Sequence, residues 1–332
     1  MGLSIGVVGA TGAVGRKMVE ILKERNIPVD SLRAFASERS AGEKFDFNGK
    51  EITVELLTEE VMKEKFDYLL FSAGGGVSEK FAPIAAEAGN IVVDNSSQWR
   101  MTEGIPLVVP EVNAHALEGY KGIIANPNCS TIQMMVALAP LHKRYGINKI
   151  VVSTYQAVSG SGHKAIVELE GQMKDESYPN KVYPRRIAAN CIPHIDVFND
   201  NGFTKEELKM VYETHKILED SNIEVNATTV RIPVFYGHSE SIYLEFKEEP
   251  DVKEVKEILA NAPGVVVVDN PEQNEYPTPL EVANTDDTYV GRIRKDLFNA
   301  KALSLWVVAD NLRKGAATNA VQIVEAMENM NK

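Results

Sequence analysis

The stretch Gly9-Ala10-Thr11-Gly12-Ala13-Val14-Gly15 decides how the first third of the chain folds. It follows the β-type run Leu3–Val8 and opens the helical pattern Ala13–Arg25. Glycines in such a strand-to-helix turn let a dinucleotide pyrophosphate approach backbone N–H groups at a helix N-terminus. The spacing GxxGxxG is a variant of the usual dinucleotide-binding pattern, so an ordinary tight turn is the alternative interpretation.

Short strands and helical patterns alternate through the rest of this region. Further expected elements are the strands Leu32–Ala36, Tyr68–Phe71, Ile91–Asp94 and Ile123–Ala125, and the helix Val77–Ala88. Such alternation is typical of a mostly parallel sheet with helices on both faces. We therefore expect an α/β fold whose N-terminal domain, residues 1–128, is doubly wound and Rossmann-type.

The pattern changes from Ile147 onward. The β-type runs there are Ile147–Tyr155, Ala227–Pro233, Ser239–Phe246 and Ala302–Ala309, with longer polar connections between them. This predicts an α+β second domain over residues 129–311. The helical C-terminal segment, 312–332, follows a strand that ends near Asp310, and we expect it to pack back on the first domain.

Composition narrows the class of protein. A length of 332 residues favours two domains over one. The net charge of −12, without a long basic run, argues against nucleic acid or an anionic membrane as partner. Two cysteines cannot build a disulfide framework, and we see neither a signal peptide nor a membrane-spanning apolar stretch, so a cytoplasmic location is expected. No Cys or His spacing is typical of a metal site.

Cys129 lies in Asn126-Pro127-Asn128-Cys129-Ser130-Thr131, between a short strand and the apolar helical run Ile132–Leu141. A helix N-terminus favours the thiolate, which is the nucleophilic form of cysteine. The alternative is a buried cysteine that acts as a small apolar residue. Cys191 has no comparable neighbours, and we interpret it as structural.

The end of the second strand carries Ser37, Arg39 and Ser40 beside Glu38. An acidic residue here would bind a ribose diol, whereas arginine with hydroxyl neighbours would bind a 2′-phosphate. We favour NADP, with Glu38 turned to solvent.

His238 follows a glycine turn at the start of a strand, and Arg231 ends the preceding one. Such residues can converge on one pocket, where histidine would move a proton near neutral pH. A histidine at the rim of a hairpin is the simpler interpretation from position alone. Three other histidines have patterns typical of structural positions: His115, His142 and His215.

Taken in order, the motifs resemble those of the aspartate-β-semialdehyde dehydrogenase family. The matching segments are GATGAVG (9–15), SERSAG (37–42), NPNCSTIQ (126–133), TYQAVSGSG (154–162), ETHKIL (213–218), RIPVFYGHSE (231–240) and ADNLRKGAATNAVQ (309–322). They span essentially the whole chain. The resemblance implies a second domain for catalysis and dimerisation, as in glyceraldehyde-3-phosphate dehydrogenase-like folds, and a homodimer.

The resemblance also implies a reaction. The family converts aspartyl-4-phosphate to aspartate-4-semialdehyde with NADPH, in lysine, threonine and methionine biosynthesis. Cys129 would be the nucleophile that forms an acyl-thioester, His238 the general acid/base, and Gln156 the residue that orients the acyl intermediate. Thiolate attack divides one difficult reduction into two easier steps.

Substrate and cofactor contacts are implied in the same way. Arg231 would bind the α-carboxylate and Glu213 the ammonium group of the substrate, while Arg100 and Lys216 would hold phosphate. From spacing alone, Glu213 and Lys216 would be an ordinary surface ion pair. The positions expected to contact NADP are Gly9, Thr11, Gly12, Ala13, Val14, Ser37, Arg39, Ser40, Ser159, Gly160 and Asn311.

Three other functions remain open at this point. N-acetyl-glutamyl-phosphate reductase uses the same thioester chemistry but needs no partner for an ammonium group. A CoA-acylating semialdehyde dehydrogenase would dispense with the phosphate contacts. A non-catalytic NADP-binding relative would lack the cysteine or the histidine. The segment 163–193, with an expected helix Ala165–Met173, would be an interface or a lid, and the sequence does not choose between them.

Overall fold

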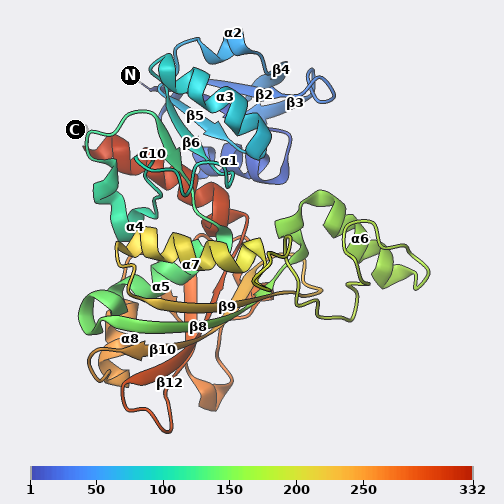
Figure 1. Ribbon diagram of the computed structural model, residues 1–332. Coiled ribbons are helices and arrows are strands. Elements are labelled where there is room, and N and C mark those ends of the chain that lie inside the picture. Colours follow the sequence, from blue (N-terminus) through green and yellow to red (C-terminus); the bar gives the residue numbers. More distant parts are fainter. Residues whose placement is uncertain (1, 331–332) are drawn as a thin grey trace. The chain divides into compact units, whose positions relative to one another are not determined.

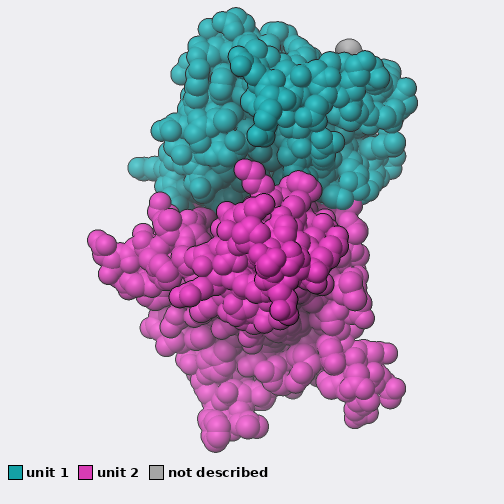
Figure 2. Space-filling model, turned by 90° about the vertical axis from the view of Figure 1, so that its right-hand side faces the viewer, with its two compact units in different colours: residues 1–128, 316–332 teal, residues 129–315 magenta. Residues whose placement is uncertain are grey.

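The computed structural model describes residues 2–330. The described chain divides into two compact units, which Figure 2 colours separately. Unit 1 holds residues 2–128 and 316–330, and unit 2 holds residues 129–315. Unit 1 is therefore built from two segments that are far apart in the sequence. The two last residues of the segment 312–332 lie outside the described residues.

Within the described residues, unit 1 is built on a seven-stranded sheet of order β3-β4-β2-β1-β5-β6-β7 (Figure 1). The strands are β1 (Leu3–Val8), β2 (Val29–Ala36), β3 (Lys44–Phe47), β4 (Lys50–Leu56), β5 (Tyr68–Phe71), β6 (Ile91–Asp94) and β7 (Ile123–Ala125). All pairs are parallel except β3 with β4. The order reverses between β1 and β5, which is the topological switch point where ligands bind in open α/β sheets. The predicted doubly wound α/β fold is confirmed.

Helices cover both faces of this sheet. They are α1 (Ala13–Glu24), α2 (Glu59–Met62), α3 (Gly75–Glu87), α4 (Pro110–Asn113), the 3-10 helix η1 (Ala114–Leu117) and α10 (Thr318–Met330). Along β1, Ile5 and Val7 point into the cluster that includes α1 and α10, and Val8 points into the cluster that includes α3. This is the alternation that a buried strand requires.

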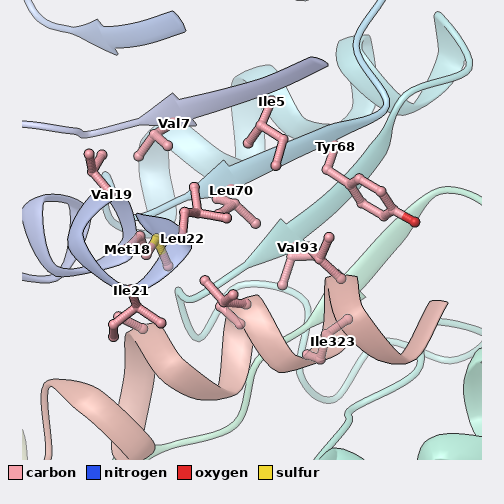
Figure 3. Close-up of a cluster of buried hydrophobic side chains, with 14 of the residues drawn as sticks. Ile5, Val7, Met18, Val19, Ile21, Leu22, Tyr68, Leu70, Val93 and Ile323 are labelled. Atoms are coloured by element: carbon pink, nitrogen blue, oxygen red, sulfur yellow. The ribbon is translucent and has the colours of Figure 1, made fainter. Parts of the chain in front are cut away.

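Figure 3 shows the first of these clusters. Ile323 from α10 packs with Ile21 and Leu22 from α1, against Leu70 and Val93 of the sheet. These side chains are all fully buried. Burial of each aliphatic side chain contributes about 1.5–3 kcal/mol. The C-terminal helix is thus part of the core of unit 1.

Unit 2, within the same description, contains a six-stranded sheet of order β11-β12-β13-β10-β8-β9. Its strands are β8 (Ile147–Gln156), β9 (Glu224–Arg231), β10 (His238–Phe246), β11 (Val265–Val267), β12 (Thr288–Lys295) and β13 (Ala302–Ala309). Strand β10 is antiparallel to both β8 and β13, whereas β8 and β9 are parallel. The carboxyl ends of β8 and β9 and the start of β10 therefore meet at one edge of the sheet.

The helices of unit 2 are α5 (Cys129–Tyr145), α6 (His163–Lys174), α7 (Lys205–Leu218), α8 (Val252–Ala260) and α9 (Pro279–Val282), with 3-10 helices η2 (Val158–Ser161) and η3 (Pro271–Gln273). A π-helical turn, Arg313–Ala317, precedes α10. Helix α5 packs on β10 and β13, and α7 packs on β9 and on α5. The sequence Thr204-Lys205-Glu206-Glu207 has the spacing of a capping box, which predicts a helix start there. In the structure Thr204 caps α7 in this way.

Several details differ from the sequence-based expectation. The expected strand Ala227–Pro233 is wrong at both ends, since β9 runs from Glu224 to Arg231. The strand does not extend to Pro233, because proline has no backbone N–H to donate to a neighbouring strand. The sequence patterns did not predict β3, β4, β11, β12 and α8. The edge strand β3 carries the charged residues Lys44 and Asp46 at exposed positions, which weakens the apolar signal.

Within residues 2–330, no helix combines the length and the apolar character that crossing a membrane requires.

Substitution of Gly15 tests the tight junction between β1 and α1. A Cβ at residue 15 would lie 2.2 Å from the carbonyl oxygen of Gly9, which is backbone and cannot swing away. We expect Gly15→Ala to lower the free energy of unfolding by about 1–3 kcal/mol, as overpacking does. Gly76→Ala is the matched control, because a Cβ there meets nothing within 4 Å. Equal stability of the two variants in urea unfolding would contradict the packing role of Gly15.

Candidate active site

Cys129 is the first residue of α5, and its side chain is partly exposed. No acidic residue occupies the first helical turn to oppose a thiolate. A Cβ on Gly315 would lie 2.9 Å from the Cβ of Cys129, so the absent side chain at 315 leaves room beside the cysteine. The helix-start position predicted from the sequence is the observed one.

His238 is the first residue of β10 and is fully buried. The backbone N–H of Ala157 donates to its Nδ1 at 3.0 Å, and Nε2 has no hydrogen-bond partner among the described residues. Burial, and then the charge of Arg231, lower the pKa of His238 to about 3. The ring is therefore neutral at physiological pH. Because Nδ1 accepts a hydrogen bond, Nε2 is the nitrogen that carries the proton.

Arg231 ends β9 and is 4% exposed. Its Nη1 donates to the carbonyl oxygen of Ala157 at 2.6 Å, while its Nε has no hydrogen-bond partner in the described chain. A Cβ on Gly160 would lie 3.1 Å from Nη1 of Arg231 and 3.3 Å from Nε2 of His238. Glycine at 160 thus keeps open a space that both side chains border.

Gln156 is the last residue of β8 and pairs with Arg231 across the parallel ladder. Its side chain is 1% exposed. Thr154 Oγ1 donates to Oε1 of Gln156 at 2.9 Å, and Nε2 of Gln156 donates to Glu206 Oε1 at 3.1 Å. The predicted residues Gln156, Arg231 and His238 therefore converge at one edge of the sheet of unit 2.

The expected cofactor residues of unit 2 lie at the same edge. Ser159 and Asn311 are buried, and their side chains form hydrogen bonds of 3.0 and 3.1 Å with each other. Asn311 Oδ1 also accepts from the backbone N–H of Gly237, the residue before His238. Asn311 thereby fixes the turn that presents His238.

Glu213 and Lys216 lie on α7. Glu213 is 1% exposed, so the surface ion pair that the spacing suggested is wrong. Burial lowers the pKa of Lys216, and the nearby charge of Glu213 opposes that shift. A buried carboxylate and a half-buried ammonium group on one helix are consistent with binding residues.

Unit 1 contains a pocket of about 440 Å³ at the switch point of its sheet. Of the expected cofactor positions, the pocket is lined by Gly9, Thr11, Gly12, Ser37, Arg39 and Ser40, together with Ser72, Ala73, Val77, Phe81 and others. Ala13 and Val14 follow directly, as the first residues of α1. Ser72 and Ala73 lie in the loop after β5, for which the sequence allowed either a cofactor-lining loop or a purely structural turn, and Val77 and Phe81 come from α3.

The glycine turn has the geometry that the sequence predicted. Gly9 has a φ of 81°, and a Cβ there would lie 2.7 Å from the carbonyl oxygen of Ser72. The N–H of Gly12 donates to the carbonyl of Gly9 at 3.0 Å, which closes the turn. A bound dinucleotide could therefore approach the N-terminus of α1 closely.

Glu38 is exposed and does not line this pocket, whereas Ser37, Arg39 and Ser40 do. The cluster therefore presents one guanidinium and two hydroxyl groups to the pocket. This arrangement suits a phosphate better than a ribose diol.

Arg100 is buried in unit 1, and its guanidinium forms hydrogen bonds with the residues that follow β6 and β7. Its Nε donates to the carbonyl of Asn126 at 2.9 Å, and Nη2 donates to that of Asn95 at 3.1 Å. Asn126 also accepts from Nδ2 of Asn319 at 2.7 Å. Part of the guanidinium thus supports the segment that leads to Cys129.

Two of the other histidines, His142 and His215, form structural hydrogen bonds. His142 Nδ1 accepts from the N–H of Ile147, and His215 Nε2 bonds the carbonyl of Ile223. His115 is exposed in η1. Cys191 is exposed. No cluster of His, Cys, Asp or Glu side chains that could hold a metal ion occurs in the described part of the chain.

Known proteins place this chain in a family. Residues 4–120 match the family described as semialdehyde dehydrogenase, NAD binding domain, and residues 138–314 match semialdehyde dehydrogenase, dimerisation domain. The chain is 56% identical to the aspartate-semialdehyde dehydrogenase of Aquifex aeolicus (strain VF5) over 98% of both sequences.

Solved structures agree. Aspartate semialdehyde dehydrogenase II from Vibrio cholerae, complexed with ASA, is similar with a TM-score of 0.96 at 48% identity over 99% of each chain. Aspartate semialdehyde dehydrogenase with NADP from Candida albicans is similar with a TM-score of 0.79 at 26% identity, covering 100% of this chain and 99% of that chain. These matches confirm the resemblance of the motifs. The chain is an oxidoreductase that belongs to the aspartate-semialdehyde dehydrogenase family.

Proposed function

We propose that this protein reduces L-aspartyl-4-phosphate to L-aspartate-4-semialdehyde, with release of phosphate, through an acyl-thioester on Cys129. One observation carries the proposal. Two buried side chains, Arg231 and His238, border the space at Gly160. Each has one nitrogen without a hydrogen-bond partner in the described chain, Nε of Arg231 and Nε2 of His238. Buried polar groups are normally satisfied, so these two indicate a polar ligand.

Arg231 is the proposed contact for the substrate α-carboxylate. Its guanidinium is fixed through Nη1 and leaves Nε for an acceptor. A carboxylate would supply both an acceptor and a countercharge in this buried position. Glu213 would bind the ammonium group, and Arg100 and Lys216 the phosphate.

Cys129 is the proposed nucleophile. Its thiolate attacks the acyl carbon; a C–S bond forms as the C–O bond to phosphate breaks, and phosphate leaves with the electron pair. Reduction of the thioester carbon then gives a thiohemiacetal, which collapses to the aldehyde and regenerates the thiolate. Nε2 of His238 is the atom at which a proton would be given and taken back, and Gln156 would orient the acyl group.

NADP(H) is the proposed cofactor, and when bound it supplies the hydride. The residues that would hold it in unit 1 are Gly9, Thr11, Gly12, Ala13 and Val14 at the glycine turn, and Ser37, Arg39 and Ser40 at the end of β2. Ser159, Gly160 and Asn311 are the other residues proposed to contact NADP(H). Arg39 with its two hydroxyl neighbours favours a 2′-phosphate over a free ribose.

The remaining assignments follow from the family. We propose a cytoplasmic homodimer with roles in lysine, threonine and methionine biosynthesis. Residues 1–128, together with 312–332, would form the domain that binds NADP. Residues 129–311 would form the domain for catalysis and dimerisation. The expected absence of nucleic-acid and membrane partners stays a prediction.

N-acetyl-glutamyl-phosphate reductase is the alternative reaction with the same chemistry, and a CoA-acylating dehydrogenase is a further one. The buried carboxylate of Glu213 favours a substrate with a free ammonium group. An acetylated amine carries no charge to offset it.

The proposal is tested in the oxidative direction. Purified protein should form NADPH from aspartate semialdehyde and NADP only when phosphate is present. Cys129→Ala should abolish turnover while NADP binding survives, because the cofactor pocket of unit 1 does not contain the cysteine. Activity with N-acetylglutamate semialdehyde or with CoA in place of phosphate would refute the proposed reaction, and full activity of Cys129→Ala would refute the nucleophile.

Arg231→Lys tests the carboxylate contact. Lysine keeps the charge but cannot offer two N–H groups in a planar fork. We expect KM for aspartate semialdehyde to rise roughly tenfold or more, with a smaller change in kcat. Steady-state kinetics at saturating NADP measure this, and an unchanged KM would remove Arg231 from the substrate site.

His238 makes stability depend on pH. Its pKa is about 3 in the folded protein and about 6.5 when unfolded, so the unfolded chain binds the extra proton between these values. Its contribution is complete above pH 6.5 and is lost as pH falls towards 3, by about 2 kcal/mol at pH 5. Urea unfolding at pH 7 and pH 5 should therefore show a larger loss for wild type than for His238→Asn. Parallel losses would mean that His238 is protonated in the folded state.

A further inference from the structure

The amide of Gln156 is held between a hydroxyl group and a carboxylate. Thr154 Oγ1 donates to its Oε1 at 2.9 Å, and Nε2 donates to Glu206 Oε1 at 3.1 Å. A carboxylate only accepts hydrogen bonds, so Nε2 must face Glu206. The planar amide then has one N–H committed to Glu206, and the direction of its second N–H is fixed.

Glu206 is itself tightly held. It lies in the first turn of α7 and is 5% exposed. Its Oε2 accepts from Lys209 Nζ at 2.9 Å, and the same ammonium group reaches Asp196 at 2.9 Å. Lys209 offsets the charge of the carboxylate, so Glu206 can stay ionised in a buried position.

The charge of Glu206 also acts on the site. It raises the pKa of His238, against the larger effects of burial and Arg231. A hydrogen bond to an ionised acceptor is about twice as strong as a neutral one and polarises the donor. The carboxylate therefore orients Gln156 and strengthens its amide as a donor.

We propose that Glu206 is a positioning residue that acts through Gln156, so that the second N–H of the amide donates to the acyl oxygen of the substrate. This inference rests on the proposed function. It deepens that function, because it assigns to the start of α7 a part in the reaction that neither its sequence motif nor the family resemblance provided.

Two substitutions of Glu206 distinguish orientation from packing. Glu206→Ala removes the acceptor, and we expect kcat for phosphate-dependent NADPH formation to fall about 10–100-fold with KM changed less than about twofold. Glu206→Gln keeps an oxygen that can accept from Gln156, so we expect partial rescue, to within about fivefold of wild type. A loss in Glu206→Gln as large as in Glu206→Ala would overturn the hydrogen-bond basis of the proposal.

A double-mutant cycle shows whether Glu206 acts through Gln156. In a Gln156→Ala background, Glu206→Ala should lower kcat by less than about twofold, because the residue it positions is already absent. Multiplicative losses in the double variant would overturn the positioning role. Thermal unfolding of each variant confirms that the folded protein is being measured.

Glu207 provides the matched control. It lies one residue further along α7 and is also buried, at 8% exposure. Its oxygens accept from the backbone N–H groups of Thr204 and Thr229, at 2.7 and 3.1 Å, and do not bond Gln156. Glu207→Gln should lower thermal stability but keep kcat within about twofold of wild type. A drop in kcat equal to that of Glu206→Gln would mean that any damage to the start of α7 lowers activity.

Wild-type activity separates the two levels of the hypothesis. If the wild type does not form NADPH from aspartate semialdehyde and phosphate, the proposed function fails and the positioning role fails with it. If the wild type is active but the cycle is multiplicative, only the role of Glu206 is wrong.

Discussion

The backbone of one residue, Ala157, holds the site of unit 2 together. Its N–H donates to Nδ1 of His238, and its carbonyl accepts from Nη1 of Arg231. These residues come from the end of β9 and the start of β10, and Ala157 directly follows β8. The contact therefore depends on the register of three strands, and a slip of one residue would turn both side chains to the other face of the sheet. The distances between Ala157, Arg231 and His238 are thus set by strand pairing over long sequence separations, and a local sequence motif cannot predict them.

The electrostatics of the site follow from this contact. Arg231 and His238 are buried side by side, and the guanidinium charge helps to keep the imidazole neutral. A buried cation is costly unless an anion accompanies it. The chain has a net charge of −12, yet the buried guanidinium of Arg231 lies at this edge of the sheet, where an anionic substrate is proposed to bind. The local arrangement outweighs the overall charge because distant exposed charges are screened by salt.

The sequence predicted those features that local patterns encode. The turn at Gly9, the helix start at Cys129 and the capping box at Thr204 each need only a few neighbouring residues, and the structure has them as expected. The sequence did not reveal the partners of Gln156, because Glu206 is 50 residues away and its own motif signals only a helix start. The burial of Glu213 was missed for a similar reason. Spacing on one helix indicates which side chains are neighbours but not what packs over them, and here β9 and α5 cover α7.

The composition of unit 1 from two distant segments has a consequence for synthesis. Helix α10, Thr318–Met330, completes the same apolar cluster as α1, near the opposite end of the chain. On the ribosome this helix emerges only after all of residues 129–315 have been made. Unit 2 can therefore complete its core before α10 is made, while unit 1 keeps an open apolar face until α10 has emerged. Premature termination before α10 would leave that face exposed and prone to aggregation, even though every residue of the glycine turn is present.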